Sequence, residues 1–161
     1  MQHQHGPIWD FVTESNRIEG IIREPTEAEV DATAAFIVKS QITIPDLVAL
    51  VAIYQPNARL RDKVGLNVRV GSHIAPPGGA GIVPALQAIL DVMGGNPWQT
   101  HVAYEILHPF TDGNGRSGRA LWAWQMLGQQ DGLPLGFLHQ FYYQTLSAGR
   151  VTRSYSKQPE R

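Results

Sequence analysis

Apolar residues recur at helical spacing along most of the chain, between clear start and stop signals. The pattern predicts a short helix over residues 8–20, which ends at Gly20, and a second helix that runs to about Lys39. Thr26 followed by Glu29 is a capping box, so the second helix begins just after Thr26. Further helices are expected over residues 46–54, 84–93, 97–107, 116–130 and 135–147.

Two segments depart from this pattern. The predicted helix 116–130 is apolar on all sides, which places it at the centre of the fold. Residues 66–75 alternate instead, and Gly71-Ser72 supplies a turn, so this segment is expected to form a β-hairpin. The sequence therefore predicts an all-α bundle of about seven helices with one small β-hairpin.

Composition limits the class of protein. With 161 residues the chain suits a single domain, and 13 Lys and Arg against 14 Asp and Glu leave no basic surface for nucleic acid. The chain has no cysteine, so thiolate chemistry and disulfides are excluded. No apolar run reaches the roughly 20 residues of a membrane span, and we expect a cytoplasmic protein without a signal peptide.

The residues that could take part in chemistry lie where one predicted helix ends and the next begins, in residues 108–119. Gly113 and Gly115 allow backbone N–H groups to converge on an anion at the start of the next helix. Arg116 and Arg119 are three residues apart and can reach the same phosphate group. This pattern predicts a site for a polyphosphate.

The same connection contains a candidate metal ligand and a candidate base. Asp112 is a hard carboxylate of the kind that holds a partly hydrated Mg²⁺ beside phosphates. His108 ends the preceding helix and can act as a base near neutral pH. Together with the phosphate site, these two residues indicate group transfer from a nucleotide.

Other phosphate and metal motifs do not fit this connection. Residues 113–118 match the dinucleotide pattern G-x-G-x-x-G, but a helix precedes them where that pattern needs a strand. An EF-hand loop that starts at Asp112 would put Ala123 where a bidentate glutamate belongs. A Walker loop would need a lysine that is absent here.

Residues 108–119, H-P-F-T-D-G-N-G-R-S-G-R, resemble the signature of the Fic (Fido-domain) family, with every defining position filled. The resemblance implies a Fic core that transfers AMP from ATP to a hydroxyl side chain of a protein. It implies that His108 deprotonates the target hydroxyl, while Asp112 holds Mg²⁺ between the α- and β-phosphates. The phosphates would be bound by Gly113, Asn114, Gly115, Arg116 and Arg119.

The resemblance extends to two further segments. The hairpin, with the Pro76-Pro77 pair beside it in a segment of residues 66–77, resembles the family's flap, which docks the target by main-chain pairing. The flap residues would be Val70, Gly71, Ser72, His73 and Ile74. Tyr142 and Tyr143 resemble the lining of the nucleotide pocket, although core packing explains either tyrosine as well.

Residues 15–20 read S-x-x-x-E-G, which resembles the inhibitory helix of Fic proteins that carry it N-terminal to the core. This resemblance implies that Glu19 pairs with Arg119 and occupies the space of the γ-phosphate. Ser15 would tether the inhibitory helix, and Gly20 completes the motif. A solvated surface glutamate is the alternative.

The resemblance therefore implies one Fic domain over residues 1–161, with an inhibitory helix at 8–20, a catalytic core at 26–149 and a polar tail at 150–161. The expected activity is Mg²⁺-dependent protein adenylylation from ATP. Removal of AMP, transfer of UMP and nucleotide binding without turnover stay open as alternatives. The partners would be ATP and a protein target, which could be the chain itself, and homo-oligomers stay open.

Overall fold

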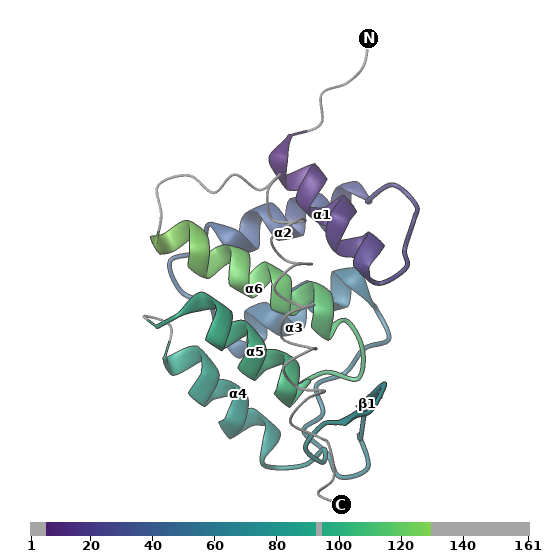
Figure 1. Cartoon of the computed structure of the whole chain (residues 1–161), viewed down its shortest axis with the longest axis vertical. Helices are drawn as coiled ribbons and strands as arrows, with labels where there is room; N and C mark the ends of the chain where they lie inside the picture. Colours follow the sequence, from purple (N-terminus) through teal and green to yellow (C-terminus); the bar gives the residue numbers. More distant parts are fainter. Residues whose placement is uncertain (1–5, 93–94, 130–161) are drawn as a thin grey trace, which may run out of the picture.

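The fold is mostly helical. The structure is a computed structural model that describes residues 6–92 and 95–129. In this part of the chain it has six helices and one antiparallel hairpin (Figure 1): α1 (Pro7–Ile18), α2 (Glu27–Ile37), α3 (Ile44–Tyr54), β1 (Arg69–Val70), β2 (His73–Ile74), α4 (Ile82–Asp91), α5 (Pro97–Leu107) and α6 (Asn114–Gln129). The expected helix 135–147, the two pocket tyrosines Tyr142 and Tyr143, and the tail 150–161 lie outside the described residues.

Helix α5 has the predicted bounds, but the other described helices are shifted at their ends. Helices α1 and α2 end two residues earlier than predicted, at Ile18 and Ile37. Helix α3 begins two residues earlier, because Thr43 and Asp46 form a capping box that the sequence interpretation missed. Helix α4 begins at Ile82 rather than at residue 84, since a proline is tolerated in the first turn of a helix.

Helix α6 begins earlier than predicted, and this difference matters most for the site. Residues 114 and 115 were expected in a turn, with the helix starting at Arg116. Instead α6 begins at Asn114, and the Ser117 N–H donates to the Gly113 carbonyl at 3.0 Å. Asn114 and Gly115 thus lie in the first helical turn, next to the free N–H groups of the helix end.

Helix α6 is the centre of the fold, as its apolar sequence predicts. It packs against α1, α2, α3 and α5, while α4 covers the far side of α5 (Figure 1). The core around it is continuous and consists mainly of aliphatic and aromatic side chains, including Phe11, Phe36, Leu47, Leu50, Leu86, Tyr104, Phe110, Leu121 and Trp122. None of the helices in the described ranges is long and apolar enough to cross a membrane.

Helix α1 is attached to α2 through a buried carboxylate. Glu29 accepts hydrogen bonds from Asn16 Nδ2 at 3.0 Å, from Arg23 Nη2 at 2.6 Å and from the Thr26 N–H at 3.2 Å. Burial alone would raise the pKa of the Glu29 carboxyl, but these hydrogen bonds outweigh it and lower the pKa. The ionised carboxylate therefore holds the N-terminal helix on the core.

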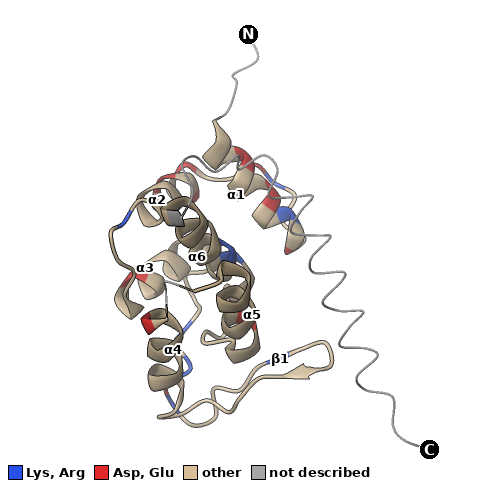
Figure 2. Ribbon diagram, turned by 60° about the vertical axis from the view of Figure 1, so that its left-hand side comes forward, with Lys and Arg blue, Asp and Glu red and all other residues tan. Residues whose placement is uncertain are grey.

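The hairpin extends away from the helices, beyond the end of α5 (Figure 2). Its register pairs Arg69 with Ile74 and Val70 with His73, so Gly71 and Ser72 form the turn as predicted. Val70 and Ile74 are exposed apolar side chains on this short sheet. An exposed strand edge is free to pair with another extended segment.

We predict that Glu29→Gln destabilises the protein by about 1–3 kcal/mol at neutral pH, because a buried hydrogen-bonded charge is lost. The folded pKa of Glu29 is lowered, so its contribution is present above the ordinary glutamate pKa and is lost as pH falls through the folded pKa. The difference between wild type and Glu29→Gln should therefore shrink on acidification. Urea unfolding at several pH values measures it, with the exposed Glu27→Gln as control. A pH-independent difference would contradict the prediction.

Candidate active site

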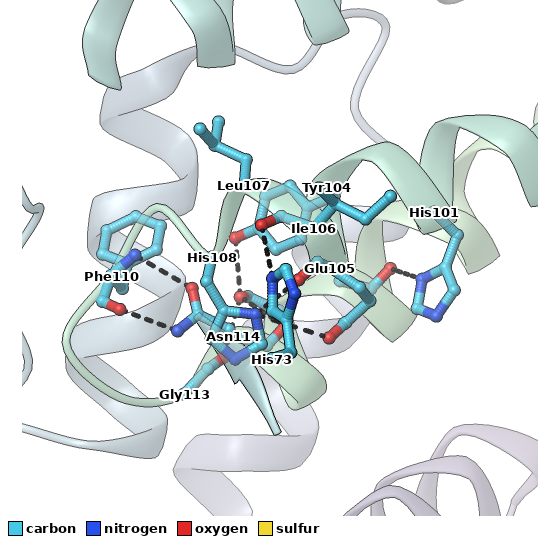
Figure 3. A network of polar contacts seen from close by, with 12 residues as sticks. His73, His101, Tyr104, Glu105, Ile106, Leu107, His108, Phe110, Gly113 and Asn114 are labelled. Carbon is cyan, nitrogen blue, oxygen red and sulfur yellow. Dashed lines mark hydrogen bonds and ion pairs between the residues drawn. The ribbon is translucent and has the colours of Figure 1, made fainter. Parts of the chain in front are cut away.

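The loop between α5 and α6 is closed by one side chain. Asn114 Oδ1 accepts from the Phe110 N–H at 2.9 Å, and Asn114 Nδ2 donates to the Phe110 carbonyl at 2.7 Å (Figure 3). Phe110 is buried in the core, so this reciprocal pair holds the loop against the protein interior. Gly113 has φ of 76°, and a Cβ there would meet Val51 at 3.3 Å, which explains why the loop needs glycine.

His108 lies where α5 ends. Its φ is 50°, the left-handed conformation that only His108 adopts among the described non-glycine residues. Its Nδ1 lies 2.6 Å from the Glu105 carbonyl, which identifies Nδ1 as the protonated nitrogen and leaves Nε2 able to accept a proton. Burial lowers the pKa of His108, and the nearby His73 and Arg61 lower it further. The hydrogen bond to the Glu105 carbonyl raises this pKa but does not outweigh the other effects. His108 is thus neutral at physiological pH.

A cavity of about 260 Å³ opens at the N-terminus of α6, lined by Glu19, Ile21, Gln55, Asp112, Gly113 and Arg116. The Arg116 side chain is only 5% exposed and lies over the Tyr54 ring, 5.3 Å from its centroid. Its Nε and Nη1 have no hydrogen-bond partner among the described residues. A buried cation with unsatisfied N–H groups beside a helix N-terminus is an arrangement that favours a bound anion.

Arg119 binds the N-terminal helix. Its Nε donates to Ser15 Oγ at 2.8 Å, and its Nη2 donates to the Ser15 carbonyl at 2.9 Å and to Glu19 Oε1 at 2.7 Å. The predicted ion pair between Glu19 and Arg119 is therefore present, and so is the predicted tether through Ser15. Gly20 follows with φ of 77° and ends the helical segment.

The Glu19 carboxylate also lies against the first turn of α6. A Cβ at Gly115 would overlap Glu19 Oε1 and would lie 3.1 Å from Arg119 Nη1. The carboxylate thus occupies the end of the helix at which a bound anion would be stabilised. The Glu19 carboxylate of the chain itself therefore fills part of the candidate anion site.

Asp112 is exposed at the mouth of the cavity. Gln55 Nε2 donates to Asp112 Oδ2 at 2.6 Å, and the Gly113 N–H donates to Asp112 Oδ1 at 2.7 Å. No cluster of three or more metal-binding side chains occurs within the described ranges. One oriented carboxylate beside an anion cavity fits Mg²⁺, which takes one or two carboxylates and completes its shell with phosphate oxygens and water.

The hairpin contacts the end of α5 close to His108. His73 Nε2 lies 2.9 Å from the Ile106 carbonyl, and the His73 and His108 ring centroids are 6.3 Å apart (Figure 3). The structure thus brings the candidate flap, Val70 to Ile74, to the candidate base. The sequence interpretation regarded His73 as a flap residue, and the structure adds that His73 joins the hairpin to the helix.

Three residues of this region were missed from the sequence. Gln55 contacts Asp112, and Arg61 contacts the backbone at His108. The Glu105 carboxylate lies 4.0 Å from His108 Nδ1 and is influenced by the charge of Arg119. Burial raises the pKa of the Glu105 carboxyl to about 7, with Glu19 raising and Arg119 lowering it. No local signal marks Gln55 or Arg61, because each acts on a segment far away in the chain.

Comparison of the chain with protein-family models, with curated proteins and with solved structures finds no match.

We predict that Gln55→Leu weakens divalent-cation binding about 10–100-fold in the presence of ATP, because an unsupported Asp112 carboxylate loses its orientation. Mn²⁺ titration followed by electron paramagnetic resonance measures the affinity, in a Glu19→Gly background that leaves the anion site open. Gln87→Leu is the matched control, since Gln87 donates to Asp91 at 2.8 Å on the surface of α4. Equal Mn²⁺ affinity of Gln55→Leu and the control would contradict the prediction.

Proposed function

We propose that this chain is a Fic-type protein adenylyltransferase, which transfers AMP from ATP to a hydroxyl side chain of a protein, and that Glu19 holds it in an inhibited state. The proposed domain is the Fic core with its flap. The complete loop motif of residues 108–119 supplies the family resemblance.

The observation that carries the proposal is the Arg116 guanidinium. It is buried in the wall of a cavity, two of its N–H-bearing nitrogens have no hydrogen-bond partner among the described residues, and a helix N-terminus and Asp112 adjoin it. Such unsatisfied donors favour a ligand with several anionic oxygens, which a triphosphate provides. A purely structural loop would satisfy this cation internally.

His108 fits the role of general base. Its Nδ1 is engaged by the Glu105 carbonyl, so the proton of a target hydroxyl goes to Nε2. The hydroxyl oxygen forms a bond to the α-phosphorus of ATP, the bond from that phosphorus to the bridging oxygen breaks, and pyrophosphate leaves. Bound at Asp112, Mg²⁺ would neutralise charge on the α- and β-phosphates. Arg116 and the first turn of α6 stabilise the phosphate oxygens during transfer.

Glu19 fits the role of an internal inhibitor. It binds Arg119 at 2.7 Å and lies against Gly115, in the part of the anion site next to Arg116. A phosphate group that reaches Arg119 must displace this carboxylate, because both anions require the same donors. The inhibited and active forms then differ in whether Glu19 or a phosphate holds Arg119.

The hairpin fits the role of a docking edge for the target. Its strands are only two residues long and expose Val70 and Ile74, and His73 places the sheet next to His108. An extended target segment that pairs with this edge would present its hydroxyl beside the base. The protein substrate would be recognised by main-chain pairing and by apolar contacts of alternate side chains.

We predict that Glu19→Gly labels proteins strongly with ³²P from α-labelled ATP in the presence of Mg²⁺, whereas wild type labels weakly. The reason is that Glu19→Gly removes the carboxylate that pairs with Arg119 and lies against the first turn of α6. Combining Glu19→Gly with His108→Ala should abolish labelling, because the base is removed. Labelling of the chain itself and of added lysate, followed by mass spectrometry, measures the transfer.

The matched control is Glu24→Gly, which removes an exposed carboxylate from the segment that follows α1. Labelling of Glu24→Gly should equal that of wild type. Equal labelling of Glu19→Gly and wild type would refute the inhibitory role. Labelling that survives His108→Ala would refute the base, and labelling from UTP but not from ATP would replace the proposed donor.

We predict that the transfer rate of Glu19→Gly rises with pH, with an apparent pKa below 6.5, the ordinary pKa of histidine. Burial lowers the pKa of His108, and Glu19→Gly removes a carboxylate that raises it, so the neutral base persists to lower pH. Initial rates at saturating ATP between about pH 5 and 8 measure this profile. An apparent pKa at or above 6.5 would contradict the prediction.

A further inference from the structure

Arg61 is completely buried, with a relative exposure of 0%, in the irregular segment between α3 and the hairpin. This segment lies along the loop that follows His108. The Arg61 N–H donates to the Pro109 carbonyl at 2.9 Å, and the Thr111 N–H donates to the Arg59 carbonyl at 2.8 Å. Arg61 is thus fixed beside the candidate active site by its own backbone.

Among the described residues, its guanidinium binds only backbone carbonyls. Nε donates to His108 at 2.6 Å and Nη2 donates to Leu107 at 2.8 Å. Nη1 donates to Leu66 at 3.0 Å and to Pro76 at 2.8 Å. No described carboxylate forms a salt bridge with it. A buried cation without a counterion is stable only because carbonyl dipoles satisfy its donors.

One end of this arrangement holds the backbone of His108. The last carbonyls of a helix have no partner within the helix, and a left-handed conformation before a proline is unfavourable for histidine. The carbonyls of Leu107, His108 and Pro109 all accept from Arg61. Arg61 therefore stabilises the unusual backbone geometry that directs the His108 ring.

The other end holds the base of the hairpin. Leu66 precedes β1 and Pro76 follows β2, so Nη1 joins the two arms where they leave the sheet. The Gly79 N–H also donates to the Arg61 carbonyl at 2.9 Å. A single side chain thus spans the base of the hairpin and the end of α5.

We infer that Arg61 is a positioning residue, which holds the hairpin and the His108 backbone in one fixed relation. This inference rests on the proposed function, in which the target docks on the hairpin and His108 accepts its proton. A misplacement of about 1 Å between reacting groups costs on the order of 100-fold in rate. Arg61 acts through the backbone and does not itself touch the substrate.

The test variant is Arg61→Lys in the Glu19→Gly background. Lysine keeps the charge but lacks the planar fork, so it cannot reach carbonyls of both segments together. The maximal rate of self-labelling should fall about 100-fold, with KM for ATP unchanged within about twofold. Arg59→Lys is the matched control, because the exposed Arg59 lies two residues away on the same segment, and its rate should be unchanged.

A readout independent of transfer is the tautomer of His108, observed by ¹⁵N NMR at about pH 8, where the ring is neutral. Wild type should show the Nδ1–H form, as the hydrogen bond to the Glu105 carbonyl requires. Arg61→Lys should show a mixture with the Nε2–H form, because the released backbone no longer holds the ring. If Glu19→Gly transfers no AMP, the proposed adenylylation fails while this measurement still decides the role of Arg61.

A folded Arg61→Lys variant with the wild-type tautomer would overturn the inference, as would a folded variant with an unchanged maximal rate. Arg61→Gln is the second variant, in case lysine is not accommodated in the buried site. Loss of cooperative unfolding in both variants would assign Arg61 a purely structural role and would also overturn it.

Discussion

Burying a guanidinium costs free energy unless acceptors satisfy its N–H groups, and the described part of this small protein has three buried arginines close to the candidate site. Arg61 is satisfied by carbonyls of the hairpin base and of the α5 end, and Arg119 is satisfied by Ser15 and Glu19 of the N-terminal segment. Arg116 is different, because Nε and Nη1 have no hydrogen-bond partner among the described residues. This difference is the reason we propose Arg116, rather than Arg61, as a phosphate-binding residue.

The sequence predicted what depends on local chemistry. Helix α5 has the expected bounds because Asn96 caps its start and the left-handed His108 before Pro109 ends it, both signals carried by neighbouring residues. The apolar α6 was correctly placed at the centre. The predicted start of α6 was wrong because Asp-Gly-Asn-Gly is typical of a turn as well as of a helix start. The hydrogen bonds of Asn114 to Phe110, which the sequence does not reveal, hold the loop so that the helix begins at Asn114.

The part of the candidate site that depends on neighbouring residues could be predicted from the sequence. Residues 108–119 are contiguous, so their residue types alone indicate a phosphate site, and the pairing of Glu19 with Arg119 came from resemblance rather than spacing. Gln55 and Arg61 could not be found in this way. Gln55 meets Asp112 across 57 positions, and Arg61 meets His108 across 47. Contacts at such separations depend on packing, which periodicity and capping do not encode.

The proposed inhibition requires a contact that is specific yet can be displaced. Arg119 is almost fully buried, with its side chain 4% exposed, whereas the Glu19 side chain is 39% exposed. Arg119 also has two hydrogen bonds to Ser15, which do not involve the Glu19 carboxylate. An exposed carboxylate is also partly solvated, which weakens its hold on Arg119 relative to a buried pair. In the proposed function, a triphosphate would bring more charge to the same donors and would additionally contact Arg116, which favours displacement of the carboxylate.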